Sequence, residues 1–97
     1  MNYQLNDYKV LRNILFSIEF MNFLFVNNYS YSMFSRKISV NSLTVKKWSD
    51  GDSFPNEFNA NLIQITTGID MEKYCDINFL RHCDVLFGYG VKFHEMV

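Results

Sequence analysis

Proline and glycine are scarce in this chain. There is one proline and there are four glycines in 97 residues, against ten phenylalanines and six tyrosines. A chain with few helix-breaking residues and many bulky apolar residues favours packed helices with short connections. Because 48% of the residues are hydrophobic, a disordered chain is excluded, and the length predicts a single domain, residues 1–97, with a modest core.

An overall excess of positive charge is also missing. The formal net charge is -1, which argues against a basic coat protein that covers nucleic acid nonspecifically. The basic residues are concentrated instead: residues 30–49 hold four of them and no acid, whereas residues 50–57 hold three acids and no base. This uneven distribution predicts one basic face, which is enough for sequence-specific binding.

The chain has two cysteines and two histidines, and the two cysteines do not make a disulfide framework. Cys75 and Cys83, if on one helix, would stand about 12 Å apart, too far to bond, so we expect free thiols in a reducing cytoplasm. Together with His82 and His94 they match no trusted zinc spacing, and we expect no metal and no cofactor. No nucleophile–base–acid pattern and no glycine-rich phosphate loop occurs, so we do not expect an enzyme.

A long uninterrupted apolar run is absent as well. Residues 11–26 are rich in Phe, Leu and Ile but contain Arg12 and Glu19, whereas a membrane span needs about 20 apolar residues. Glu19 also argues against a signal peptide. We therefore expect a buried helix over residues 7–27 of a soluble protein, capped by Asn6 or Asp7. Its apolar stripe is expected to comprise Leu11, Ile14, Leu15, Ile18, Met21 and Phe25.

Four further helices follow from caps and apolar spacing. Ser30 caps a short helix, residues 39–41 form a tight turn, and Asn41 or Ser42 caps a third helix over about 42–50. Pro55 is expected at the first position of the next helix, which ends at Gly68, and Asp70 caps the last one, over 70–87. Their expected core-facing residues are Met33, Phe34, Ile38, Leu43 or Thr44, Val45, Trp48, Phe58, Leu62, Ile63, Ile65, Tyr74, Ile77, Leu80 and Leu86. The prediction is an all-α, compact bundle of about five helices.

The second and third of these helices have the outline of a helix-turn-helix, over about residues 30–50. In that motif the first helix braces the second, whose N-terminal half enters the major groove of DNA. The close approach needs a small residue in the first helix, and Ser35 fits. It also needs apolar residues that face the core from the turn and the second helix, and Val40 and Val45 fit.

The run from Phe34 to Gly51, followed by Pro55, resembles the Cro/lambda-repressor-like helix-turn-helix family, and the family-like region covers residues 30–68. The residues in register with the family pattern are Val40, Thr44, Val45, Trp48, Gly51 and Pro55. Ser39 stands where the family has a turn glycine, and Asp50 and Asp52 are acidic where the family often has basic or amide residues. The resemblance implies a lambda-repressor-like bundle that binds double-stranded DNA.

The resemblance also implies which residues contact DNA. Base-edge contacts fall to Ser42, Leu43 and Lys47, and Lys46 matches a position that contacts a base or a phosphate. The candidates for phosphate contact are Ser30, Tyr31, Arg36 and Lys37. Without the motif, the lysines would be interpreted as a solvated helix face. The implied function is that of a repressor-like transcriptional regulator acting as a homodimer.

The dimer surface and one alternative function stay open at this stage. The dimer could form through the surplus apolar surface of residues 8–25 or through the last helix, with Phe79, Val85 and Phe87. The alternative function is a helix-turn-helix protein that acts mainly on a protein partner, as an antitoxin-like or phage-encoded inhibitor. The overall acidity and the Asp50/Asp52 pair motivate it.

Overall fold

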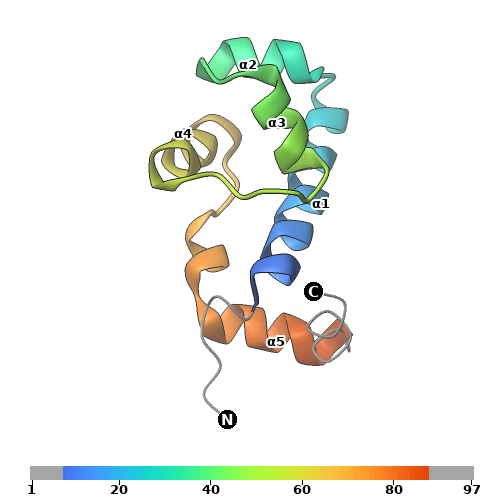
Figure 1. Cartoon of the computed structure of the whole chain (residues 1–97), viewed down its shortest axis with the longest axis vertical. Helices are drawn as coiled ribbons and strands as arrows, with labels where there is room; N and C mark the ends of the chain where they lie inside the picture. The colour runs from blue at the N-terminus through green and yellow to red at the C-terminus, as the bar shows by residue number, and fades with distance from the viewer. Residues whose placement is uncertain (1–7, 88–97) are drawn as a thin grey trace.

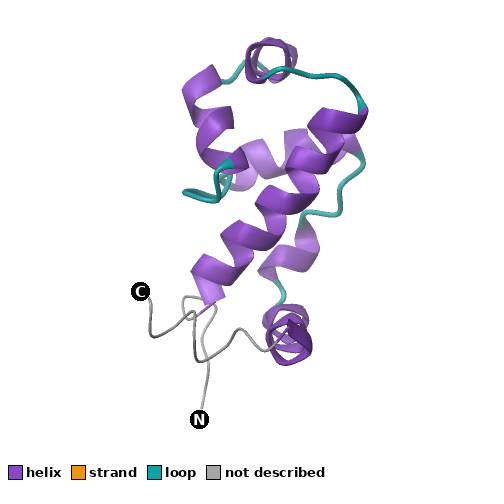
Figure 2. Ribbon diagram, turned by 90° about the vertical axis from the view of Figure 1, so that its right-hand side faces the viewer, coloured by secondary structure: helices purple, strands orange, loops and turns teal. Residues whose placement is uncertain are grey.

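The computed structural model describes residues 8–87, and every regular element in this range is helical. The elements are α1 (Lys9–Val26), α2 (Tyr31–Ile38), α3 (Ser42–Ser49), α4 (Glu57–Thr67), the 3-10 turn η2 (Glu72–Cys75) and α5 (Ile77–Phe87). Figure 1 shows α2, α3 and α4 gathered around one end of α1, while α5 lies across the other end. The view turned by 90° in Figure 2 shows short loops between these helices. The expected all-α class with five helices is confirmed for the described residues.

An aromatic core joins the first three helices. Phe20 of α1 meets Phe34 of α2 edge to face with ring centroids 5.1 Å apart, and meets Trp48 of α3 at 6.1 Å. All three side chains are buried. Such aromatic pairs stabilise a core beyond the area they bury, so α1 acts as the support against which α2 and α3 are fixed.

The buried face of α1 is only in part the one expected. Of the expected stripe, Ile18, Met21 and Phe25 are exposed, with 58%, 45% and 83% of their surface in contact with solvent. Leu11 of that stripe is buried and Leu15 packs against the core, but the other buried residues of α1 are Phe16, Ser17, Phe20 and Leu24. The reason is that α1 has two apolar stripes, and the aromatic one fits around Phe34 and Trp48. The predicted caps Asn6 and Asp7 lie outside the described residues.

The fourth helix begins later and packs less than expected. Asn56 caps α4 by accepting a hydrogen bond from the Asn59 backbone N–H at 2.8 Å, so Pro55 precedes the helix and does not begin it. Of the predicted apolar face only Ile63 is fully buried, whereas Phe58 and Ile65 are 71% and 82% exposed. The helix ends as expected, at Gly68, which has φ 77°.

The predicted last helix is divided in two. Asp70 accepts from the Glu72 backbone N–H and Asp76 accepts from the Asn78 backbone N–H, so each carboxylate starts its own turn. Between the two turns, Asp76 has an extended backbone conformation that ends η2 before α5 begins. A second, smaller core cluster then forms where Leu80 of α5 meets Leu11 and Tyr8. The continuous 70–87 prediction was wrong because it overlooked the second cap.

A polar contact ties η2 back to α1. The Lys73 Nζ atom lies 2.9 Å from Glu19 Oε1, and the Tyr74 hydroxyl donates a hydrogen bond to the same carboxylate. The Tyr74 ring is buried in the aromatic core, where it meets Phe16 edge to face. The end of the molecule that holds α2 to α4 and the end that holds α5 are therefore connected by α1 and by the contact of Lys73 and Tyr74 with Glu19.

Candidate nucleic-acid interface

The four residues predicted to contact bases share the outer face of α3. Ser42, Leu43, Lys46 and Lys47 are all exposed, and at 3.6 residues per turn they span an arc of about 140°. Val45 and Trp48 point the opposite way and are buried. The structure thus brings these four side chains together on one side of a helix whose other side is fixed in the core.

The N-terminal end of α3 is capped by Asn41. Its side-chain oxygen accepts a hydrogen bond from the Leu43 backbone N–H at 2.8 Å. Because Asn41 takes the capping role, the Ser42 hydroxyl is not used for it, and Ser42 and Leu43 stand exposed in the first turn. A helix N-terminus attracts negative charge, so this end of α3 favours a phosphate-bearing partner.

Lys46 differs from Lys47 because it already has a partner. Its Nζ atom lies 3.0 Å from Asp50 Oδ2, one turn further along the helix. The hydrogen bond to Asp50 and the charge of that carboxylate raise the pKa of Lys46. Lys47 is exposed and has no ion pair within residues 8–87. Of the two lysines, Lys47 therefore presents the uncompensated positive charge.

The start of α2 lies close to the face of α3. Ser30 caps α2, because its hydroxyl accepts from the Met33 backbone N–H at 3.1 Å. Tyr31 follows at the first position of α2, half exposed, and its phenol interacts electrostatically with Lys46. The two predicted phosphate contacts at this point are thus adjacent to the predicted base contacts.

Arg36 and Lys37 occupy the last turn of α2. Both are exposed; helical spacing puts Arg36 on the side away from the buried Phe34 and Ile38, and Lys37 at the edge of the buried side. Neither forms an ion pair with any residue of the described range. Positive charge at a helix C-terminus also stabilises the helix, so this position gives them a structural role that needs no DNA. The structure does not place them on the α3 face.

The contact between α2 and α3 depends on small and apolar residues. Ser35 is buried, and its hydroxyl is turned back to donate to the Ser32 carbonyl oxygen at 2.8 Å. Val40, in the turn, packs against the main core, and Val45 is fully buried. Ser39 has φ 57° and ψ 44°, a left-handed conformation that closes α2. These contacts fix the direction in which α3 presents its outer face.

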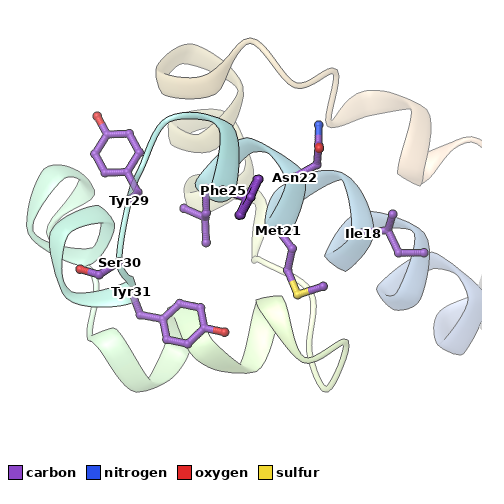
Figure 3. Close-up of a pocket in the computed structure, with 8 residues that line it drawn as sticks. Ile18, Met21, Asn22, Phe25, Tyr29, Ser30 and Tyr31 are labelled. Atoms are coloured by element: carbon purple, nitrogen blue, oxygen red, sulfur yellow. The ribbon is translucent and has the colours of Figure 1, made fainter.

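Sequence reasoning missed a groove beside this face. The groove has a volume of about 680 Å3 and lies between the second half of α1 and the start of α2. Figure 3 shows Met21, Phe25 and Tyr31 around it, with Ile18 further along α1. The signal that could have revealed it is the presence of two apolar stripes on α1, because one layer of neighbours covers only one of them.

No cluster of three or more His, Cys, Asp or Glu side chains that could hold a metal exists within residues 8–87; His94 of the zinc set considered above lies outside this range. Cys75 is exposed and Cys83 is buried, neither in a disulfide, and burial raises the pKa of the Cys83 thiol.

One finding concerns membranes. Within the described residues no single helix is both long and apolar enough to cross a bilayer; α1 and α2 reach that length and composition only when taken together, and they are bent by 99° at their junction.

Comparison of the chain with models of known families, with curated proteins and with solved structures finds no match.

Proposed function

We propose that the protein is a sequence-specific DNA-binding transcriptional regulator, repressor-like, in which α2 and α3 act as a Cro/lambda-repressor-like helix-turn-helix. The observation that carries the proposal is the outer face of α3. It offers Ser42, Leu43 and Lys47 to solvent on a helix that is anchored through Val45 and Trp48. A rigid helix with an uncovered polar and basic face is what the major groove admits.

The proposed contacts follow from the chemistry of each side chain. Ser42 can bond to several base edges, Leu43 can meet a thymine methyl group, and Lys47 can reach the acceptors of guanine. Lys46 can also contact the DNA once its ion pair with Asp50 is broken. Ser30 and Tyr31 contact phosphates beside the start of α3, and Arg36 and Lys37 contact phosphates further out along α2.

One such unit reads only a few base pairs, so the proposal includes two copies on a site with two-fold symmetry. Regulation takes place in the cytoplasm, where the free thiols of Cys75 and Cys83 stay reduced.

The deciding experiment is a selection of bound sites from random duplex DNA, followed by titration of the selected site. Lys47→Ala is expected to lower the affinity about tenfold or more, because one base contact is worth about 1–3 kcal/mol. Lys9→Ala is the matched control: it removes the same charge from the first turn of α1, at the end away from α2 (Figure 1). The control is expected to change the affinity less than twofold.

Two results would contradict the proposal. One is a selection that enriches no sequence and shows no salt-sensitive binding. The other is equal affinity for the Lys47→Ala and Lys9→Ala variants.

A second candidate function is supported by the Lys46–Asp50 ion pair, which neutralises half of the positive charge that α3 offers. In this alternative the same helices bind a protein, and the chain acts as an antitoxin-like or phage-encoded inhibitor. Co-purification of a stoichiometric protein partner, together with the absence of DNA binding, would favour this alternative over the first.

A further inference from the structure

The exposed side of α1 carries a regular apolar stripe. Ile14, Ile18, Met21 and Phe25, here called the outer stripe, follow one another at steps of four, three and four residues. Ile14 is half-buried beside the turn at Gly51, and the other three are 58%, 45% and 83% exposed. Steps of three and four residues are the spacing at which one helix packs along a second helix. Within the described residues, no helix covers this side of α1.

The groove continues the outer stripe onto α2. Beyond Met21 and Phe25 its lining includes Tyr29 and Tyr31, and Figure 3 shows the Tyr31 ring on the same side as Met21. The combined surface is apolar, and its polar members, Asn22 and Ser30, carry no charge. Contiguous exposed apolar side chains often mark an interaction site, so this surface is a candidate interface.

The charges of α1 indicate which partner fits. The helix has three charged residues, and helical spacing puts all of them on the side away from the outer stripe. Arg12 stacks 4.3 Å above the Phe54 ring, and Glu19 is bound to Lys73. A two-fold interface places the same surface of the two copies face to face. An uncharged stripe can therefore pair with itself, whereas a stripe whose charges all have one sign would repel its copy. A helix that lies on a membrane surface would instead have lysines or arginines beside its apolar face.

We propose that two copies of this chain pair through their outer stripes, with α1 packed on α1 of the second copy across a two-fold axis. The groove between α1 and α2 takes up side chains from the second copy, of which Phe25 is the most exposed candidate. This pairing rests on the proposed function in one respect, because it supplies the two copies that the proposal includes. It is measured without DNA, so a failure to pair is distinguished from a failure to bind DNA.

The test is sedimentation equilibrium of the full chain at micromolar concentration. The wild type is expected to be a dimer. Met21→Glu and Phe25→Glu are each expected to weaken association at least a hundredfold, because each puts two carboxylates into an apolar seam. Both positions are already open to solvent, so circular dichroism is expected to show an unchanged fold.

Phe58→Glu is the matched control. Phe58 is 71% exposed, but it lies on α4 and not in the outer stripe. This variant is expected to dimerise like the wild type. If the Phe58→Glu variant is monomeric, the proposal is overturned and the dimer interface is assigned to α4. A wild-type chain that is monomeric would overturn the proposal as well.

Mixing two variants tests whether the partner is a second copy. Chains carrying Met21→Glu and chains carrying Met21→Lys are expected to be monomeric alone and to form mixed dimers together, because opposite charges then meet in the seam. Variants that remain monomeric on mixing would overturn the proposal. So would monomers that bind phosphatidylglycerol vesicles through Met21 and Phe25, since the stripe would then face lipid.

Discussion

Ser39 has a backbone conformation that favours glycine. It sits at φ 57°, ψ 44°, where the side chain of an L-residue crowds the following carbonyl group. Its backbone N–H still donates to the Ser35 carbonyl oxygen, so the strained turn closes α2 and sets the path to α3. Replacing it tests how much stability this turn costs.

Ser39→Gly is expected to raise the free energy of unfolding by about 0.5–1 kcal/mol, because glycine adopts the left-handed region without strain but loses more chain entropy on folding. Urea denaturation measures the change. Asn28→Gly is the matched control: Asn28 has φ 58°, but asparagine accepts this region more readily, so a smaller gain is expected. Equal gains at both sites, or a loss at Ser39, would contradict this account of the turn.

The helix caps show what single residues reveal in a sequence. Ser30 was predicted as a cap, and Asn41 was one of two candidates beside Ser42; Ser30 and Asn41 both accept a capping hydrogen bond from the backbone. Such signals can be identified because a cap needs only a short polar side chain and two or three neighbours along the chain. Asp76 was missed because Asp70 lies six residues earlier and offers an equally good start, and the spacing alone does not show that both are used.

At the scale of the element, α1 shows why the buried side of a helix is harder to predict than its existence. The 3–4 spacing of Ile14, Ile18 and Met21 is as regular as that of Phe16, Phe20 and Leu24. Periodicity measures amphipathic spacing, but the choice between two stripes is made by the shape of Phe34 and Trp48, which come from elsewhere in the chain. Phe58 and Ile65 on α4 were misassigned for the same reason.

The outer face of α3 was easier to predict, because a motif relates it to its buried side. Once Val45 and Trp48 are assigned to the core, the 3.6-residue period leaves Ser42, Leu43, Lys46 and Lys47 outside. What the sequence could not provide was the pairing of Lys46, since an exposed lysine at that spacing can turn toward Asp50 or toward solvent. This pairing leads to a prediction about α3 as a whole.

Asp50→Asn is expected to increase DNA affinity about five- to tenfold near 0.1 M salt, because it frees Lys46 and removes a negative charge from the face that meets phosphates. The effect on stability is expected to be small, since exposed ion pairs at this spacing contribute little. Titration of the selected DNA site measures the affinity. Glu72→Gln in η2 removes one negative charge outside α2 and α3 and is expected to change the affinity little. A decrease for Asp50→Asn would show that the ion pair orients Lys46 for binding.

At the scale of the whole molecule, stability depends on how η2 and α5 are joined to the aromatic end of α1. Tyr74 combines both kinds of contact, because its ring packs against Phe16 and Phe54 while its hydroxyl donates to Glu19. Burial raises the pKa of Tyr74 above its ordinary value of 10.0, and the hydrogen bond to Glu19 and the charge of that carboxylate add to the effect. The folded chain thus keeps a proton that the unfolded chain releases near pH 10.

This difference gives the molecule a defined response to alkaline pH. A group whose pKa is higher in the folded state contributes its full stabilisation below the unfolded pKa and loses it as the pH rises above that value. The free energy of unfolding is therefore expected to fall from about pH 10 upward, by as much as 1.4 kcal/mol per pH unit for this one group.

Tyr74→Phe is expected to be about 2 kcal/mol less stable at neutral pH, because a hydrogen bond to a charged acceptor is lost, and to have a shallower decline above pH 10. Urea denaturation at a series of pH values measures both slopes, and Tyr31→Phe, which removes a tyrosine at the molecular surface, is expected to keep the wild-type slope. Equal slopes for Tyr74→Phe and the wild type would mean that the junction at Glu19 does not control the alkaline stability of the chain.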